Sequence, residues 1–357
     1  MNLKKIVIFW VMLFLLSGCV IKFSTKKPTI GGIFLSFDKG NSWQTSSALL
    51  KTGNENQNFQ GTNINFLIMD PTDNQALYAG TPDGLYYTYN GTGGWQKTLS
   101  GLGNIKDLAI DPKNHCTLYA AINNRLYKST DCSRHWDYTL IEAGNPPDIS
   151  AIGVDSYNPE NVYVATIKGG LFKSEDYGVS WHNLKYFDNP LKDILITPSD
   201  TRIIYLITES NGIYRTTDTA NTWLEITENI KKAMDENKID VNCGNYKEFR
   251  NLIFDPQNDS RLLYASRCLY ETSDRGDNWQ QIKLLTRPVD TNIWGLAVSY
   301  HNNQEIYYGT NTTFYRTIDN GQNWITKDLP TLRNAAILLT DPVNPTLIYL
   351  GLNDFKK

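Results

Sequence analysis

The stretch SEDYGVSW, residues 174–181, is one copy of a motif that recurs along the chain and decides its fold. The motif, which we call the box, reads Ser/Thr-x-Asp-x-Gly-x-x-Trp, and its copies end at Trp43, Trp95, Trp136, Trp181, Trp223, Trp279 and Trp324. The copies at Trp136 and Trp223 lack only the glycine, and the copy at Trp95 has Asn90 in place of the aspartate. Successive tryptophans are 52, 41, 45, 42, 56 and 45 residues apart, a period typical of one four-stranded propeller blade.

The residue types of the box suit a tight turn. The acidic position is occupied by Asp38, Asn90, Asp131, Asp176, Asp218, Asp274 and Asp319. We expect the carboxylate to accept turn N–H groups, the hydroxyl to add a local hydrogen bond, and the glycine to take a positive φ. The indole should cover the hairpin, a burial that contributes roughly 1.5–3 kcal/mol per ring. These aspartates are therefore interpreted as structural. The copies lie far apart on the rim, and none adds a second carboxylate at calcium-loop spacing.

The sequence before each box repeats as well. In residues 64–88 we predict a first strand over 64–69, a second over 76–80 and a third over 85–88, joined by turns at Asp70-Pro71 and Pro82-Asp83-Gly84. The box then forms the hairpin between the third and fourth strands.

The two ends of the chain complete one another. Residues 32–43 supply a third strand, a box and the start of a fourth strand, whereas residues 335–352 supply a first and a second strand. We therefore predict an all-β protein whose residues 31–357 form a single seven-bladed β-propeller of four-stranded antiparallel blades, with the last blade closed by N- and C-terminal strands.

This pattern resembles the Asp-box (bacterial neuraminidase repeat) propellers over nearly all of residues 31–353. Relatives of that kind include sialidases, xyloglucanases, sortilin-type receptors and photosystem II assembly factors. The phrases Leu-Tyr-x-Gly-Thr at 77–81 and Asp-Pro-x-Asn-Pro at 341–345 are most similar to the last three groups. The resemblance implies the fold but no single function, because one fold hosts many.

The N-terminus predicts export. Lys4 and Lys5 precede an apolar run over 6–16, which ends in Leu-Ser-Gly-Cys at 16–19. This segment resembles a lipoprotein signal, which implies cleavage after residue 18, lipid attachment at Cys19 and a tether over 19–30 in the bacterial cell envelope. The alternative is an ordinary signal peptide with an incidental cysteine. Anchoring by several acyl chains would hold the protein on a membrane, extracytoplasmic, without spanning it.

Charge argues against a nucleic-acid partner. The net charge is −3 and becomes −5 when Lys4 and Lys5 leave with the signal peptide, whereas nucleic-acid binders usually carry a basic excess. The four remaining cysteines, Cys116, Cys132, Cys243 and Cys268, suggest two disulfides in an exported chain.

The alternation of strand direction selects the disulfide pairing. Cys116 and Cys132 fall on the face that carries the boxes, and Cys243 and Cys268 fall on the other, so we predict these two pairs. The alternative for the first pair is a zinc site with His115 and His135, although we assign no metal. The second bridge should pin residues 226–248 over the channel mouth. This insertion stretches one spacing to 56 and contains an expected helix over 228–237; it is either a tolerated loop or a partner-binding cap.

Positions four and five residues before each Asp-Pro turn should lie near the mouth of the central channel. They hold Asn65, Lys106, Asp107, Lys192, Asp193, Arg250, Asn251 and Trp294. This mixed ring with a basic lean could bind an anionic group or a sugar stacked on Trp294. Alternatively, it is a solvated channel mouth with one packed indole.

No motif establishes catalysis. A glycosidase needs two carboxylates about 5–10 Å apart, which Asp107 and Asp193 could supply only across two blades. A sialidase-like Arg-Ile-Pro segment is missing, since Thr286-Arg287-Pro288 lacks the isoleucine, and xyloglucanases use tandem propellers. We therefore predict a non-catalytic, membrane-anchored binding or assembly module without a cofactor, whose partner is another protein or a glycan. The alternative is a carbohydrate-active enzyme, a glycoside hydrolase or sialidase-like. Its mark would be two acids with shifted pKa values facing one deep pocket.

Overall fold

The computed structural model describes residues 27–50, 57–142, 144, 146–288 and 291–354. The predicted signal peptide, Cys19 and residues 19–26 of the tether lie outside this part of the chain. Within it, no helix is both long and apolar enough to cross a membrane.

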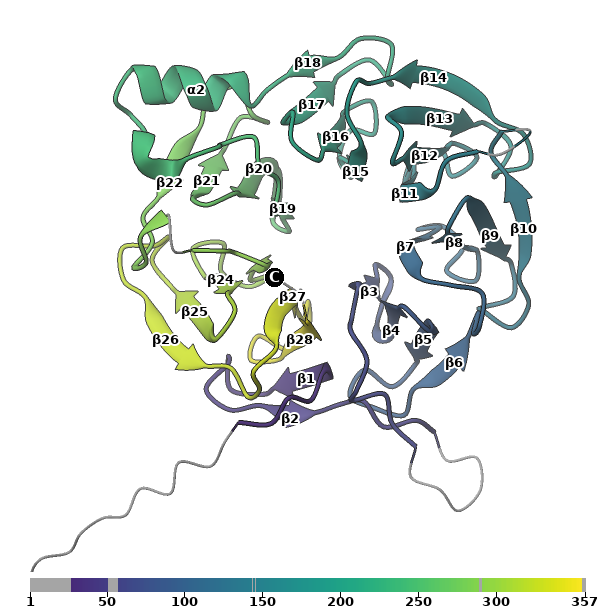
Figure 1. Ribbon diagram of the computed structural model, residues 1–357, viewed down its shortest axis with the longest axis horizontal. Coiled ribbons are helices and arrows are strands. Elements are labelled where there is room, and N and C mark those ends of the chain that lie inside the picture. Colours follow the sequence, from purple (N-terminus) through teal and green to yellow (C-terminus); the bar gives the residue numbers. More distant parts are fainter. Residues whose placement is uncertain (1–26, 51–56, 143, 145, 289–290, 355–357) are drawn as a thin grey trace, which may run out of the picture.

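Seven four-stranded antiparallel sheets surround a central channel (Figure 1). Blade 1 comprises β3 (Phe66–Asp70), β4 (Asp73–Thr81), β5 (Gly84–Thr88) and β6 (Gln96–Thr98). Blade 2 comprises β7 (Ile105–Ile110), β8 (Leu118–Ile122), β9 (Arg125–Ser129) and β10 (Asp137–Leu140). Blade 3 comprises β11 (Ile149–Val154), β12 (Val162–Thr166), β13 (Gly170–Ser174) and β14 (His182–Tyr186).

The next three blades follow the same order from the channel outward. Blade 4 comprises β15 (Leu191–Ile196), β16 (Ile204–Thr208), β17 (Ile213–Thr216) and β18 (Leu224–Glu225). Blade 5 comprises β19 (Asn251–Asp255), β20 (Asn258–Ala265), β21 (Leu269–Thr272) and β22 (Gln280–Ile282). Blade 6 comprises β23 (Gly295–Val298), β24 (Ile306–Gly309), β25 (Thr313–Thr317) and β26 (Ile325–Asp328).

Both ends of the chain build blade 7. Its strands are β27 (Asn334–Thr340), β28 (Ile348–Asn353), β1 (Gly32–Ser36) and β2 (Gln44–Thr45). β28 pairs with β1 over five residue pairs, with Phe34 opposite Leu350 at the centre. The predicted seven-bladed closure is therefore confirmed.

The second strand of each blade is buried on both faces, because a neighbouring blade packs against each side of it. In six blades a tyrosine follows the residue of this strand that pairs with the box serine or threonine, and these are Tyr78, Tyr119, Tyr163, Tyr205, Tyr307 and Tyr349. Blade 5 has Leu263 there, also fully buried. Face-to-face packing explains why these strands read as continuous apolar runs rather than as alternating patterns.

The box forms the expected turn with one addition. In the copy at 174–181, Asp176 Oδ1 accepts the Ser180 N–H at 2.8 Å, and the Ser174 hydroxyl accepts the Gly178 N–H at 2.7 Å. Gly178 has the predicted positive φ of 85°, but Tyr177 before it is also left-handed, at 59°. The turn therefore requires two consecutive residues with positive φ. The first of them, Tyr177, is not a glycine, and the hydrogen bonds of the box stabilise it in this conformation.

The two copies without glycine keep this turn. Ser133 and Ala220 stand at the glycine position with φ of 67° and 72°. Burial of the tryptophans is less complete than predicted: Trp95 and Trp279 are 1% and 4% exposed, whereas the other five are only partly buried. Those five contribute less apolar burial than the full range expected for an indole.

The insertion is ordered but does not cover the channel, so its predicted placement is wrong. It forms α2 (Glu228–Asp235) and a short 3-10 turn, η1 (Val241–Cys243). α2 lies at the outer edge of the molecule beside β18 and β22 (Figure 1), where Ile230 and Met234 join a core cluster with Tyr205 and Trp279. The apolar face of the helix covers the side of blade 5, and this burial draws the insertion outward.

Both predicted disulfides are present. Cys116 is joined to Cys132, and Cys243 to Cys268 with their Cα atoms 5.5 Å apart. The second bridge fixes the end of the insertion to the link between β20 and β21. It therefore anchors the insertion to blade 5, rather than over the channel mouth.

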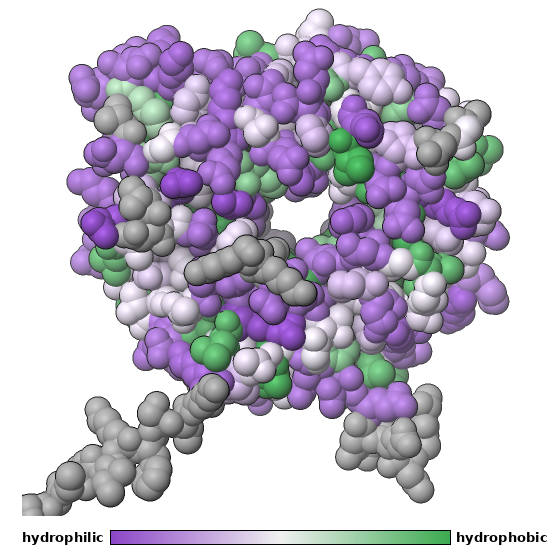
Figure 2. Space-filling model, in the orientation of Figure 1, coloured by the Kyte–Doolittle hydropathy of each residue, from purple (hydrophilic) through white to green (hydrophobic). Residues whose placement is uncertain are grey.

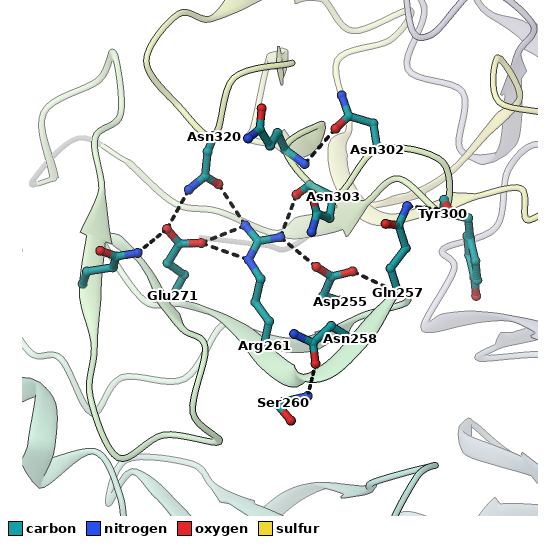
Figure 3. A network of polar contacts seen from close by, with 12 residues as sticks. Asp255, Gln257, Asn258, Ser260, Arg261, Glu271, Tyr300, Asn302, Asn303 and Asn320 are labelled. Carbon is teal, nitrogen blue, oxygen red and sulfur yellow. Dashed lines mark hydrogen bonds and ion pairs between the residues drawn. The ribbon is translucent and has the colours of Figure 1, made fainter.

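A buried ionic network joins blades 5 and 6 (Figure 3). Arg261 donates to Glu271 Oε2 at 2.7 Å, to Asp255 Oδ2 at 3.0 Å and to Asn320 Oδ1 at 2.9 Å. Asn320 belongs to the box of blade 6, and its amide also donates to Glu271 Oε1 at 2.7 Å. Each buried charge thus has an opposite charge and several hydrogen bonds, as such groups require.

Candidate binding site at the channel mouth

The first strands of six of the seven blades line a cavity of about 830 Å³, and all eight predicted channel-mouth residues lie on its wall. Figure 2 shows the molecule hollowed at this point, with mostly hydrophilic residues on the rim. The spacing of these residues from the Asp-Pro turn was therefore sufficient to place them on one surface.

Two β-bulges explain why neighbouring residues share this surface. The pairing of β7 with β8 shifts register between Ile105 and Asp107, and that of β15 with β16 shifts between Leu191 and Asp193. Side chains of a regular strand alternate between faces, but a bulge re-aims one of them. Lys106 and Asp107 consequently both line the cavity, as do Lys192 and Asp193.

Three cations surround the mouth in different states of pairing. Lys192 pairs with Glu209 at 2.9 Å, and Arg250 pairs with Glu248 at 2.5 Å. Lys106 is exposed, and no residue in the described part of the chain forms an ion pair with it. An exposed lysine of this kind is available to an anionic ligand without first losing a partner.

Arg250 and Trp294 form a stacked pair. The guanidinium carbon lies 4.9 Å from the centre of the indole ring, within the range of a cation–π contact. The Trp294 Nε1–H donates to Asn311 Oδ1 at 2.5 Å, which fixes the orientation of the ring. Because Arg250 covers part of the indole, a sugar would have to compete with it for stacking.

The two acids in the cavity have raised pKa values. Burial, and secondarily the charge of Asp193, raise the pKa of Asp107 to about 8. Burial raises the pKa of Asp193 to about 7. Both carboxylate oxygens of Asp107 accept backbone N–H groups, from Leu108 at 2.8 Å and from Ile152 of the next blade at 2.7 Å. The mark expected of an enzyme is therefore present, although Asp107 also bridges two blades.

The amides near the mouth bridge blades as well. Asn65 Nδ2 donates to Ile105 O at 2.8 Å, and Asn251 Nδ2 donates to Trp294 O at 3.3 Å. Sequence reasoning missed two further polar residues of the cavity, Asn104 and Asn353. Asn104 could have been found, because it precedes Lys106 by two residues in the link that leads into β7.

The candidate zinc cluster is a disulfide. Ligand atoms of His115, Cys116 and Cys132 lie within 4.8 Å of one another, but the two sulfurs are bonded. His135 turns its Nδ1 to Asp131 Oδ2 at 2.5 Å instead. The pairing predicted for an exported chain accounts for this group.

The insertion borders a cavity of its own. A space of about 550 Å³ lies between α2 and the blade 5 box, lined by Lys232, Glu236 and Trp279 among others. The interpretation of the insertion as a partner-binding element therefore keeps a physical basis, but at the outer edge of the molecule.

Comparison with known proteins gives the same architecture. The family model Sortilin-Vps10 (sortilin, neurotensin receptor 3) matches residues 169–283, which is less than half of the chain. The comparison with curated protein sequences finds no significant match.

Solved structures with this fold belong to functionally different proteins. YCF48 bound to D1 peptide is 16% identical with a TM-score of 0.61, and the match covers 87% of this chain and 99% of that one. YCF48 from Cyanidioschyzon merolae is 12% identical with a TM-score of 0.60, covering 81% and 95%. The GH74 xyloglucanase from Xanthomonas campestris is 15% identical with a TM-score of 0.61, covering 82% of this chain but 51% of the enzyme. The chain thus spans about half the length of that enzyme, and these likenesses establish the fold alone.

Proposed function

We propose that this protein is an Asp-box propeller that acts as a non-catalytic binding or assembly module of the bacterial cell envelope, with the channel mouth as its recognition surface. The observation that carries the proposal is that the eight predicted polar, charged or aromatic side chains, which come from five blades, meet in one cavity of about 830 Å³. A concave site with convergent polar groups is the usual form of a binding site.

The structurally similar proteins support two alternative kinds of partner, a peptide or a glycan. YCF48 is a chain of similar extent whose structure holds a D1 peptide, and it supports a role for a single propeller in peptide binding. The GH74 enzymes support a glycan.

The proposal is tested by binding of the purified mature protein to peptide and glycan arrays. We expect a ligand whose binding falls at least about tenfold in Trp294→Ala and Lys106→Gln, because these variants remove the ring and the unpaired cation from the mouth. Lys327→Gln, an exposed lysine on the outer strand β26, should bind as the parent protein does. Equal binding by all four proteins would place recognition elsewhere.

Anchoring is proposed separately, through a lipid on Cys19. Metabolic labelling with a fatty-acid analogue should mark the protein, and Cys19→Ala should abolish the mark. Labelling that persists in this variant would contradict the lipoprotein assignment.

A second function, glycoside hydrolysis, is favoured by one observation. Asp107 and Asp193 line the same cavity, and both have raised pKa values, as a general acid requires. Release of reducing ends from plant or bacterial polysaccharides, lost in both Asp107→Asn and Asp193→Asn, would establish hydrolysis and overturn the non-catalytic proposal.

A further inference from the structure

Two blades each place a lysine followed by an aspartate at the channel mouth, and in both pairs the lysine is the more exposed residue. Lys106 and Lys192 stand at the bulge position five residues before the first turn of their blades, and Asp107 and Asp193 follow them directly. All four side chains line one cavity together with Arg250. No other ionisable side chain among the described residues lines this cavity, although Glu209 and Glu248 pair with Lys192 and Arg250 from beside it.

We propose that the mouth binds an anionic group carried on a peptide, and that ionisation of Asp107 and Asp193 releases it. This inference rests on the proposed function of the mouth as a recognition surface. The cations attract the anion. The two acids beside them, when ionised, offset the positive potential and weaken this attraction.

The protonation states explain the direction of the effect. When both acids are neutral, the three cations outnumber the two glutamates that pair with Lys192 and Arg250, so the mouth carries a net charge of +1. When both are ionised, two negative charges stand among them and repel an anion, and inside a protein such charges are weakly screened. Each acid raises the free energy of ionising the other, which is visible in the contribution of Asp193 to the pKa of Asp107.

The walls favour a peptide over a glycan. Besides the charged residues, the cavity is lined by large apolar side chains, which include Phe66, Ile68, Phe249, Phe254 and Ile337. Leucine-like side chains flanking an acid would bury apolar surface there, and a sugar has much less apolar surface to bury. Arg250 already covers part of Trp294, so a sugar would have to displace the guanidinium in order to stack on that ring.

The test uses a capped peptide, Ala-Leu-Glu-Glu-Leu-Ala, and its Gln-Gln counterpart, titrated calorimetrically at about pH 5.5 and about pH 8.5. Glutamates of a free peptide have a pKa of about 4.3, so the probe stays ionised throughout. We expect the acidic peptide to bind at least about tenfold more tightly at the lower pH, and the amide peptide to bind weakly at both. The double variant Asp107→Asn/Asp193→Asn should bind at the higher pH as tightly as the parent does at the lower one.

Matched controls separate the mouth from general surface charge. Lys106→Gln should weaken binding of the acidic peptide at the lower pH, whereas Lys327→Gln and Asp137→Asn, exposed residues of outer strands, should behave as the parent. A pH-independent affinity, or pH dependence that survives in the double variant, would overturn the inference.

Two other outcomes have distinct meanings. If the amide peptide or a neutral sugar binds at the mouth and Trp294→Ala abolishes that binding, the proposed function stands and the anionic assignment is wrong. If a sulfated disaccharide shows the expected pH profile and the acidic peptide does not bind, the peptide assignment is wrong.

A ligand-independent measurement checks the same acids. The pKa values in the folded protein are about 8 for Asp107 and about 7 for Asp193, above the ordinary 3.8. Between pH 3.8 and these raised values, the folded protein therefore binds more protons than the unfolded chain does. Stability from this source is present at low pH and is lost as the pH rises toward about 8. The melting temperature of the parent should fall across that window more steeply than that of the double variant. Parallel profiles would contradict the protonation behaviour that the inference requires.

Discussion

Within a single box, the buried hydroxyl is the most constrained group. Ser174 is fully buried, and its Oγ accepts the Gly178 and Asp176 N–H groups and donates to Asp176 Oδ1. The aspartate is partly exposed, and hydrogen bonds from Ser180 lower its pKa well below the usual range. The sequence motif predicts the residue types, but it does not predict that the hydroxyl is more buried than the carboxylate, because burial depends on the neighbouring blade.

Ser174→Ala should therefore lower the free energy of unfolding by about 1–3 kcal/mol, since it leaves the buried Gly178 N–H without its acceptor. Denaturant unfolding measures the loss. Ser180→Ala is the matched control, because that exposed hydroxyl serves the same turn and its removal should change stability much less. Equal losses of unfolding free energy in the two variants would show that the buried hydroxyl matters no more than the exposed one.

For Asp107 in the channel, the sequence predicts the position of the side chain but not its pKa. The position of Asp107 follows from its spacing to the Asp-Pro turn. Its raised pKa depends on burial and on Asp193, which is 86 residues further along the chain. The bridging bond from Ile152 likewise comes from another blade.

At the scale of strands and blades, two neighbouring interfaces use the same positions with opposite charges. Arg261 and Glu271 in blade 5 correspond to Glu305 and Arg316 in blade 6, where Glu305 accepts from Arg316 at 2.7 Å and from Lys39 of blade 7 at 2.8 Å. The repeat alignment contains this signal, because equivalent positions carry opposite charges, but the sequence alone does not show that they meet at a blade interface.

Arg261→Met should destabilise the protein by about 3–5 kcal/mol, because it leaves Asp255 and Glu271 buried without a cation. Arg267→Met, which removes an exposed arginine from the same blade, should cost little by comparison. Thermal and chemical unfolding of the two variants provide the comparison. A small effect of Arg261→Met would mean that water or rearrangement satisfies the two acids.

The insertion illustrates a limit at this scale. Sequence predicted a helix over 228–237, close to α2 at Glu228–Asp235, and the correct disulfide to Cys268. It did not predict the direction in which the segment leaves the blade. That direction is decided by Ile230 and Met234, which find apolar partners on the outer side of blade 5.

For the whole molecule, closure was predictable because a repeat constrains the ends as strongly as the middle. Deleting residues 334–357 removes β27 and β28, which leaves β1 paired with β2 alone and opens the ring. We expect loss of cooperative thermal unfolding, measured by near-ultraviolet circular dichroism, together with aggregation. Unchanged melting of the shortened chain would contradict closure by these strands.

Site-specific photo-crosslinking can establish whether recognition takes place at the channel mouth. A diazirine-bearing lysine analogue is placed at position 106, at position 232 beside the outer cavity of α2, or at position 327 on β26, and the protein is irradiated in intact cells. If the partner binds at the channel mouth, position 106 alone captures it, and Trp294→Ala removes the crosslink. Capture at position 232 with none at position 106 would contradict binding at the mouth and assign recognition to the insertion.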